Sequence, residues 1–288
     1  MAQPQTIGVI GGSGLYELEG LQNVREVELA TPFGAPSDAY ITGVLDGVPM
    51  VFLPRHGRGH RISPSEINFR ANIWGLKKLG VERILSVSAV GSMREDIAPG
   101  HFVAIDQFFD RTRHRTDTFF GGGVVAHVMF ADPVCEAQRQ LVVSTGRSLG
   151  QTVHDGGVYI NMEGPQFSTR AESRIYRKWG VDVIGMTNLQ EAKLAREAEL
   201  CYTTIAMATD YDCWHEGHDA VTVEQVVAVM HSNVGNAKKL VAALAPQLAR
   251  VPRTCGCSSA LKYAVMTAKD KITPEARLRL ELLLGKYL

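Results

Sequence analysis

The chain has 288 residues, 45% of them hydrophobic, which is the composition of an ordinary globular protein. Its 30 Lys and Arg residues balance its 30 Asp and Glu residues, so no overall charge would draw it to nucleic acid or to a membrane surface. No apolar run approaches the roughly 18 residues of a transmembrane helix, no export signal is visible, and the cysteines suggest no disulfide framework, which together predict a cytoplasmic protein.

The first predicted element is a short apolar strand at residues 6–10, followed at once by the turn Gly11-Gly12-Ser13-Gly14. Glycines let backbone N–H groups approach an anion closely, and the Ser13 hydroxyl adds a donor. The spacing is not G-x-G-x-x-G, and no clear helix signal follows. The turn therefore predicts a phosphate loop rather than a dinucleotide site.

A hairpin is predicted next, because residues 40–45 and 48–53 alternate around Asp46-Gly47. Its second strand runs into a loop at residues 54–61 that is rich in basic residues and glycine and includes Arg55 and His56. Such a loop suits phosphate, to which Arg offers a bidentate fork. A solvated basic loop is the alternative. Ser63, Pro64 and Glu66 then predict a helix start with a capping box.

A buried strand is predicted at residues 83–90 and ends in a second Gly/Ser turn that contains Ser88 and Ala89. This turn is a second candidate anion site. Residues 110–123 have no periodicity, which is typical of a functional lid or an interface loop. His127 follows this loop, and either a ligand contact or a purely structural role is open for it.

The remaining chain alternates strand, loop and helix, which predicts an α/β fold with a largely parallel sheet covered by helices on both faces. One domain is expected over residues 1–250, with a linker and helical tail at residues 251–288 packed on it. The helices are expected at residues 132–149, from a Thr169/Glu172 capping box to 180, at 189–199, from 222 to about 245, and after Thr273.

The segment Cys201–Trp214 begins as a buried strand and then places Asp210 and Asp212 at its carboxyl end. Ligands of open α/β sheets bind outside the carboxyl ends of the strands. Two residues apart, the carboxylates point the same way if the chain is still extended there. Alternatively, one Asp caps the next helix and the other faces water.

The tail carries Cys255-Gly256-Cys257. A Cys-x-Cys pair needs a second pair for a four-ligand zinc site, and the sequence shows none. The pattern therefore favours thiols that are incidental or redox-active.

Two glycine/serine turns and a basic loop would converge on one phosphate, and an acidic pair would face a heterocycle. No metal-ligand cluster, no G-x-S-x-G nucleophile and no P-loop lysine accompanies them. This combination favours phosphate itself as the nucleophile, with an acid protonating the leaving group, as in glycosyl cleavage. It predicts no metal and no cofactor, with inorganic phosphate as a co-substrate.

Together, several motifs closely resemble the 5′-methylthioadenosine phosphorylases of the trimeric purine nucleoside phosphorylase family, over roughly residues 6–247. They are Ile10-Gly-Gly-Ser-Gly-Leu15, Thr31-Pro-Phe-Gly34, Arg55-His-Gly-Arg58, Asn72-Ile-Trp74, Glu163-Gly-Pro-Gln-Phe-Ser168, Met186-Thr187 and Met207-Ala-Thr-Asp-Tyr-Asp-Cys-Trp214. The resemblance implies a single α/β domain with a mixed, partly barrel-like central sheet flanked by helices.

The resemblance also implies roles for individual residues. It places Asp210 and Asp212 at purine-binding positions, with Asp210 as the acid that serves N7. It implies a neighbouring subunit as the source of His127, and hence a homotrimer or a dimer of trimers. Phosphate-binding positions match Ser13, Arg55, His56, Ser88, Ala89 and Thr187, and substrate-binding positions match Phe167, Ser168, Met186, His127 and Val223. Some heat-stable relatives carry a Cys-x-Cys that can form a disulfide.

The implied reaction is the phosphate-dependent cleavage of 5′-methylthioadenosine to adenine and 5-methylthioribose 1-phosphate. A purine nucleoside phosphorylase acting on adenosine, inosine or guanosine is the alternative. The 6-oxopurine relatives typically have Glu, Asn and His where Ser168, Asp210 and Val223 stand. A nucleotide-binding protein without phosphorolysis is a third hypothesis, but it leaves the acidic pair and the basic loop without a role.

Overall fold

One mixed sheet of eleven strands organises the fold, in a computed structural model that describes residues 4–12, 14, 15, 17–215 and 223–288, apart from the side chains of residues 223–228. The main path through the sheet is β2-β3-β4-β1-β5-β10-β9-β7, and β11, β6 and β8 branch from β5. The strands are β1 (Thr6–Gly11), β2 (Gln22–Val27), β3 (Tyr40–Leu45), β4 (Val48–Pro54), β5 (Val81–Ser92), β6 (Phe102–Ala104), β7 (Gln107–Arg111), β8 (Val153–Asp155), β9 (Val158–Met162), β10 (Val183–Gly185) and β11 (Cys201–Asp210).

Strand β5 is the point at which the sheet divides. It pairs in parallel with β1 and β11, while Gly91 and Ser92 at its end pair antiparallel with β10. Six of the ten strand pairings are parallel and four are antiparallel. The sheet is therefore mixed, as the resemblance implied. The largely parallel sheet expected from the strand–helix alternation was too regular, because the β2–β4 meander and the β5–β10 and β6–β11 pairs are antiparallel.

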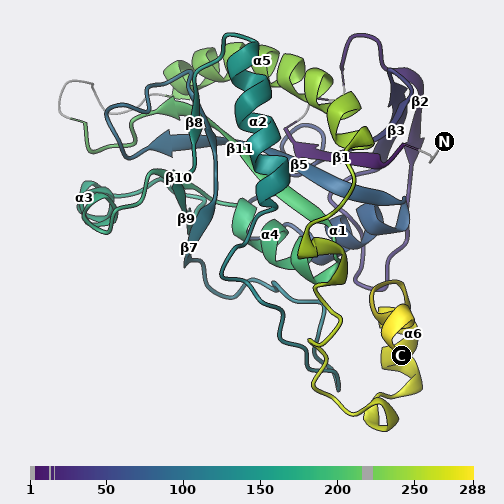
Figure 1. Cartoon of the computed structure of the whole chain (residues 1–288). Coiled ribbons are helices and arrows are strands. Elements are labelled where there is room, and N and C mark those ends of the chain that lie inside the picture. The colour runs from purple at the N-terminus through teal and green to yellow at the C-terminus, as the bar shows by residue number, and fades with distance from the viewer. Residues whose placement is uncertain (1–3, 13, 16, 216–222) are drawn as a thin grey trace.

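Helices cover both faces of this sheet (Figure 1). Helices α2 and α5 contribute to one buried apolar cluster, and α1, α4 and α6 contribute to another. The helices are α1 (Phe69–Lys78), α2 (Glu136–Ser148), α3 (Arg170–Lys178), α4 (Asn188–Glu197), α5 (Val223–Arg250) and α6 (Pro274–Leu284), with 3₁₀ turns η1 (Gly256–Ser259), η2 (Lys269–Lys271) and η3 (Gly285–Tyr287).

Several local predictions are confirmed, including the β3–β4 hairpin, in which both Asp46 and Gly47 have positive φ, and the Thr169 capping box of α3. The helix start at Ser63 was wrong. Glu66 does accept the Ser63 N–H, but α1 begins only at Phe69, where Asn68 accepts the Ala71 N–H. The contact between Ser63 and Glu66 closes only an isolated turn at residues 64–66, because the chain leaves helical geometry before Asn68.

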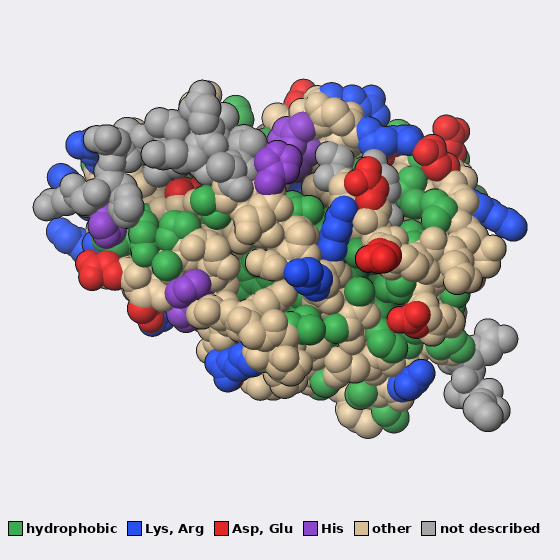
Figure 2. Space-filling view, turned by 90° about the horizontal axis from the view of Figure 1, so that it is seen from above, with side chains coloured by type: hydrophobic (Ala, Val, Ile, Leu, Met, Phe, Trp, Pro, Cys, Tyr) green, Lys and Arg blue, Asp and Glu red, His purple; other side chains and the backbone are tan. Residues whose placement is uncertain are grey.

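The tail after residue 250 packs on the same core as the rest of the chain. Leu261, Ile272 and Leu280 belong to the buried cluster that also contains residues of α1 and α4. Lys and Arg side chains lie interspersed with Asp and Glu on the face seen in Figure 2, which fits the balanced net charge. Within the described residues, no helix combines the length and apolar character needed to cross a bilayer.

Candidate active site

Four neighbouring parallel strands, in the order β4-β1-β5-β11, bring most of the predicted site segments to one edge of the sheet. Gly11 at the end of β1 pairs with Pro54 at the end of β4, and the Arg55 N–H donates to the Gly11 carbonyl at 2.9 Å. On the other side of β1, β5 and β11 run in parallel until Asp210. The carboxyl ends of such strands are where α/β sheets bind ligands.

Ala89 marks an opening in this edge. It is exposed although Ser88 and Val90 on either side of it in β5 are buried, as is its partner Met207 in β11. The hydroxyl of Ser88 makes one weak hydrogen bond, 3.4 Å long, to the Ala89 carbonyl. A strand position that is open to solvent inside a buried sheet leaves room for a ligand to reach the backbone.

Arg55 is buried, with 3% of its surface accessible, so the alternative of a solvated basic loop does not hold for this side chain. Its Nε lies 2.5 Å from Glu191 Oε1 and its Nη2 lies 3.1 Å from Oε2, so the ion pair is bidentate. Nη2 also donates to Ser86 Oγ and Nη1 to the Val87 carbonyl. Among the described residues, the second N–H of Nη1 has no hydrogen-bond partner.

Glu191 is the main residue that the sequence reasoning missed. It lies in the first turn of α4 and accepts hydrogen bonds from Arg55, from Ser86 Oγ at 2.6 Å and from Tyr202 Oη at 2.9 Å. Asn188 Nδ2 donates to the same Ser86 oxygen. The only sequence signal was an acidic residue soon after Thr187, a pattern that helix starts commonly show. This network holds the guanidinium rigidly beside the predicted phosphate site.

His56 is held as a neutral imidazole. Its Nδ1 is 2.8 Å from the Ile62 carbonyl, which can only accept, so Nδ1 carries the proton. Burial and the adjacent Arg55 charge lower the pKa of His56 to about 4. The ring stacks on His60, with centroids 4.4 Å apart. Nε2 is therefore an acceptor at neutral pH, suited to a hydroxyl of a phosphate.

Thr187 lies immediately before α4 and is buried, yet its hydroxyl makes no capping hydrogen bond to the helix. The N-terminus of a helix favours an anion, and α4 offers its first N–H groups there. Tyr159 is a second residue absent from the sequence predictions. Its buried hydroxyl is near the Thr187 backbone and Ser88, without a hydrogen bond of ordinary geometry to either.

Asp210 and Asp212 do come together, but not through the extended backbone that the i, i+2 spacing suggested. Strand β11 ends at Asp210, and Asp212 has a left-handed backbone with φ of 51°. This turn lets the Asp212 N–H donate to Asp210 Oδ1 at 2.8 Å. A Cβ atom on Gly91 would lie 3.0 Å from Asp210 Oδ1 and 3.4 Å from Asp212 Cβ, so glycine there lets the pair pack against β5.

Both carboxyl groups are hard to ionise. Burial raises the pKa of Asp210 against the hydrogen bonds from Thr209 and Asp212, and burial with the Asp210 charge raises the pKa of Asp212 to about 6. Thr209 Oγ1 is 2.7 Å from Asp210 Oδ2 and 3.2 Å from the Val90 carbonyl. The Thr209 hydroxyl can donate to the Val90 carbonyl instead of to Asp210. A protonated Asp210 can then donate to Thr209 Oγ1, so the contact between the two side chains is kept.

The segment after β9 lies beside the acidic pair. The Cys213 thiol, directly after Asp212, donates to the Ser168 carbonyl at 3.3 Å. Met186 is half-buried and packs against Gly164, where a Cβ would lie 2.5 Å from its Sδ. Phe167 is 68% exposed, so its ring does not yet cover the site in this chain alone.

His127 is not brought to this edge. Its N–H donates to the Ala264 carbonyl, and Ala126 pairs with Val265, so the loop before it runs along the C-terminal tail. In Figure 1 this teal loop lies beside the yellow tail at the lower end, far from the end of β11. Ser13 and the Val223 side chain lie outside the described residues.

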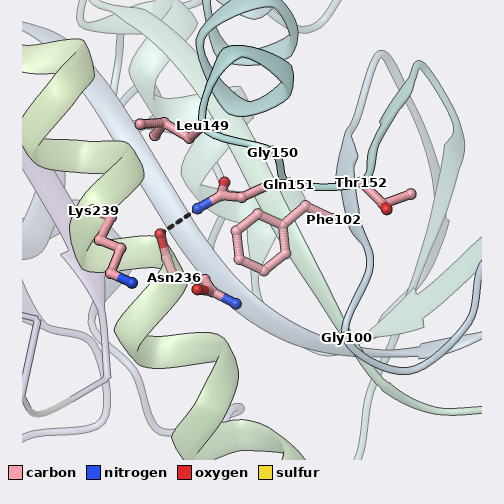
Figure 3. Close-up of a pocket in the computed structure, with 8 residues that line it drawn as sticks. All are labelled: Gly100, Phe102, Leu149, Gly150, Gln151, Thr152, Asn236 and Lys239. Carbon is pink, nitrogen blue, oxygen red and sulfur yellow. Dashed lines mark hydrogen bonds between the residues drawn. The ribbon is translucent and has the colours of Figure 1, made fainter.

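A separate hollow of about 290 Å³ lies between α5 and the turn after α2 (Figure 3). Gln151 Nε2 crosses it to the Asn236 carbonyl at 2.9 Å. It contains none of the predicted site residues and offers no carboxylate. Its lining consists of Gly100, Phe102, Leu149, Gly150, Gln151, Thr152, Asn236 and Lys239.

A buried arginine lies at one end of this edge and a half-buried acidic pair lies at the other. The chain belongs to the phosphorylase superfamily, whose family model matches residues 6–246. It is 62% identical over 284 residues to the S-methyl-5′-thioadenosine phosphorylase of Geobacter sulfurreducens, with 98% of this chain and 99% of that protein covered. The corresponding protein of Koribacter versatilis is 58% identical over 281 residues, covering 98% and 96%.

Solved structures agree with the sequence relatives. A methylthioadenosine phosphorylase from an Antarctic soil metagenomic library superposes with a TM-score of 0.94 at 43% identity, covering 98% of this chain and all of that one. The methylthioadenosine phosphorylase of Schistosoma mansoni, solved with adenine, gives a TM-score of 0.83 at 37% identity, covering 89% and 96%.

Proposed function

We propose that this chain cleaves 5′-methylthioadenosine with inorganic phosphate, yielding adenine and 5-methylthioribose 1-phosphate. The observation that carries the proposal is the pairing of two groups at one sheet edge. Arg55, His56 and Thr187 offer donors and an acceptor for phosphate, Asp210 and Asp212 offer a proton and an acceptor for a purine, and the exposed Ala89 lies on the strand between them. The names of the sequence relatives support the same substrate.

In this reaction a phosphate oxygen forms a bond to C1′ of the ribose as the C1′–N9 bond breaks. The electron pair of the broken bond passes to the purine, which becomes more basic as the bond lengthens. The protonated Asp210 gives its proton to N7, so that neutral adenine leaves. A carboxylic acid is matched to this task when its pKa is raised toward the working pH, as burial does for Asp210.

Asp212 gives the site its preference for a 6-amino group. In its carboxylate form, Asp212 can accept a hydrogen bond from the amino group. The oxygen of a 6-oxo group carries a partial negative charge, so the Asp212 carboxylate would repel it. This disfavours the alternative of an inosine or guanosine phosphorylase.

A substrate panel tests the function directly. Methylthioadenosine, adenosine and inosine are incubated with and without phosphate, and the free base and sugar phosphate are quantified. We expect adenine from methylthioadenosine only when phosphate is present, together with an equal amount of 5-methylthioribose 1-phosphate. Base release without phosphate, or inosine as the best substrate, would overturn the proposal.

The same proposal includes a reaction without a metal or an organic cofactor. The positive charge and donors that phosphate needs come from Arg55, His56 and the start of α4. Turnover is expected to be unchanged in EDTA under conditions in which the protein stays folded. A loss of turnover that added Mg²⁺ restores would contradict it.

We also propose a homotrimer or a dimer of trimers in the cytoplasm. The segment on either side of His127 exposes apolar side chains, with Val125 49% and Met129 86% accessible, which a subunit contact would bury. A second copy would then bring His127 to its neighbour's 5′ substituent. The five cysteines form no disulfide bond, as a reducing compartment favours. Sedimentation at assay dilution checks the assembly, and a fully active monomer would refute it.

A further inference from the structure

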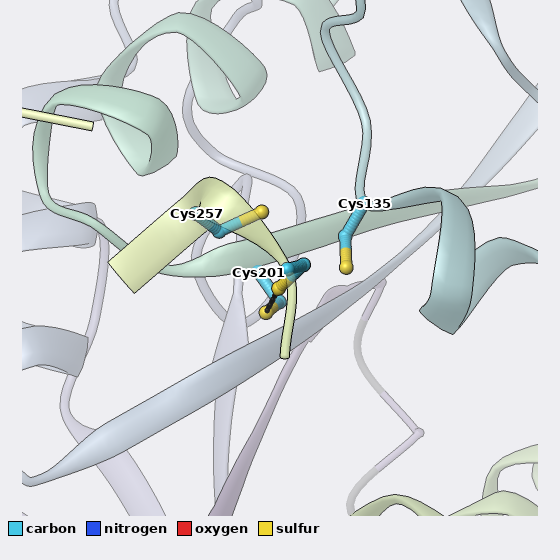
Figure 4. A group of neighbouring side chains, drawn as sticks. Cys135, Cys201 and Cys257 are labelled. Atoms are coloured by element: carbon cyan, nitrogen blue, oxygen red, sulfur yellow. Dashed lines mark hydrogen bonds between the residues drawn. The ribbon is translucent and has the colours of Figure 1, made fainter. Parts of the chain in front are cut away.

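Four of the five cysteines converge at one place, although their spacing in the sequence gives no sign of it. Cys135 precedes α2, Cys201 begins β11, and Cys255 and Cys257 flank the start of η1. Their four sulfur atoms all lie within 4.8 Å of one another. Figure 4 shows Cys135, Cys201 and Cys257 approaching a common point from these separate segments. The second pair that the Cys-x-Cys motif lacked in the sequence is thus supplied by the fold.

The spacing of the sulfurs suits a tetrahedral metal ion. Zinc binds thiolate sulfur at about 2.3 Å, which separates the sulfurs of a tetrahedral site by about 3.8 Å. Cys201 Sγ and Cys255 Sγ are 3.4 Å apart, and the remaining sulfurs need to move by no more than about 1 Å to reach that geometry. Cys135, Cys201 and Cys257 are buried, so water has little access to the cluster.

The surroundings carry the opposite charge to the one that such a site would create. A zinc ion with four thiolates has two net negative charges. Arg83 Nη1 is 3.9 Å from Cys201 Sγ, and the Arg253 guanidinium also interacts with Cys201. The Nε of Arg253 is buried without a hydrogen-bond partner in the described part of the chain. Cys135 stands at the N-terminus of α2, where the helix dipole favours a thiolate.

We propose that Cys135, Cys201, Cys255 and Cys257 bind one structural zinc ion. Four protein ligands leave no open position on the metal, so its role is to hold the fold and not to react. Binding displaces the thiol protons into solvent and needs no oxidant. The ion joins the tail, through Cys255 and Cys257, to α2 and β11. It thereby anchors the segment that pairs with the loop before His127.

The test is the metal content of the full-length protein, purified in reducing buffer without chelator and measured by elemental mass spectrometry. We expect one zinc ion per chain. Cys201→Ser and Cys257→Ser are expected to lose it, whereas Cys213→Ser, a matched change of the fifth cysteine, keeps it. Replacing zinc by Co²⁺ should give the visible absorption of a tetrahedral thiolate site.

Thiol reactivity supplies a second readout that needs no variant to fold. In the native protein the four cluster thiols should be shielded from a thiol reagent, and a mercurial should release zinc in proportion to the thiols that it blocks. Metal-free protein that takes up no added zinc would overturn the proposal. So would the mass deficit of disulfide bonds among these cysteines in freshly purified, unreduced protein. None of these measurements depends on the phosphorolysis assay.

Discussion

The two ends of the candidate site differ in whether their charged side chains have a partner of opposite charge. At one end, the Arg55 guanidinium is buried and forms a bidentate ion pair with the Glu191 carboxylate. At the other end, the Asp210 carboxyl group accepts hydrogen bonds from the Thr209 hydroxyl and from the Asp212 N–H, and no Lys or Arg side chain of the described residues lies within salt-bridge distance of Asp210 or Asp212.

The contrast shows how one fold prepares two kinds of chemistry. The bidentate ion pair between Arg55 and Glu191 fixes the position of the guanidinium, as the proposed binding of an anion requires. Carboxyl groups that are buried without a cation keep pKa values above the ordinary range, so they can exchange a proton near neutral pH. In the proposed reaction, the ion pair at one end would hold the phosphate in place, and the carboxyl groups at the other end would transfer a proton.

The largest expected effect comes from removing the transferable proton. Asp210→Asn keeps the size of the side chain but cannot pass a proton to N7, so kcat with methylthioadenosine should fall on the order of 10²–10⁴-fold. Turnover of a 6-oxo nucleoside should fall less, because the amide can donate to O6. The control is Asp96→Asn, an exposed change beside Arg94, which should leave kcat near wild type. Intact 6-amino turnover in Asp210→Asn would mean that Asp210 is only structural.

Breaking the ion pair should mainly cost stability. Glu191→Ala leaves the Arg55 charge buried without compensation, which costs about 3–5 kcal/mol in comparable cases, and Arg55→Ala leaves the Glu191 charge in the same position. Urea unfolding measures the loss, and the KM for phosphate should rise in whatever folded protein remains.

The matched control for this change is Glu136→Ala, which removes the surface partner of Arg139. Glu136 has a 62% exposed side chain, so the expected loss is below about 1 kcal/mol. Equal losses for Glu191→Ala and Glu136→Ala would show that the Arg55 network is no better shielded than a surface pair.

A smaller effect is expected from crowding the acidic pair. In Gly91→Ala the new methyl group would lie 3.0 Å from Asp210 Oδ1 and 3.0 Å from Ile184 Cγ2, so one of them must move. Overpacking of this kind costs about 1–3 kcal/mol, and displacing Asp210 should lower kcat more than it changes the KM for phosphate. Gly235→Ala in α5, with nothing near the new methyl group, is the control. A kcat unaffected by Gly91→Ala would argue against precise placement of Asp210.

The smallest effect is expected at Glu197, a buried acid that lies away from the site. It accepts hydrogen bonds from Thr118 Oγ1 and the Phe119 N–H, and burial raises its pKa to about 7 from an ordinary 4.5. Because the folded protein holds this proton more tightly than the unfolded chain, stability should fall as the pH rises from about 4.5 to about 7.

Glu197→Gln imitates the protonated acid and should reduce that fall. Thermal unfolding at several pH values between 4.5 and 7 measures the slope, with Glu95→Gln as an exposed control. An unchanged slope would mean that burial does not raise the pKa of the Glu197 carboxyl group in this fold. It would also weaken the argument that burial raises the pKa of Asp210.

Much of the site could be predicted from the sequence, because its residues directly follow strands. Arg55 and His56, Ser88 and Ala89, and Asp210 each stand just after or at the end of a run of apolar β-formers, and parallel strands carry such positions to one edge. The motifs that resemble a known family added the particular roles. The spacing of apolar residues and the positions of glycine and proline predict local structure well. Here they already predict which polar residues lie at the ends of the strands, where α/β sheets bind ligands.

What depends on contacts between distant segments could be decided only by the tertiary structure. The charge of Arg55 is balanced by Glu191, which lies 136 residues away in the sequence. Asp210 and Asp212 come together because Asp212 has a left-handed backbone and the pair packs against Gly91. Four cysteines from three segments likewise converge only in the fold. Sequence alone determined which chemical groups end the strands. Their burial, their partners and hence their pKa values arise from packing, because desolvation and ion pairing depend on which atoms surround a charge in space.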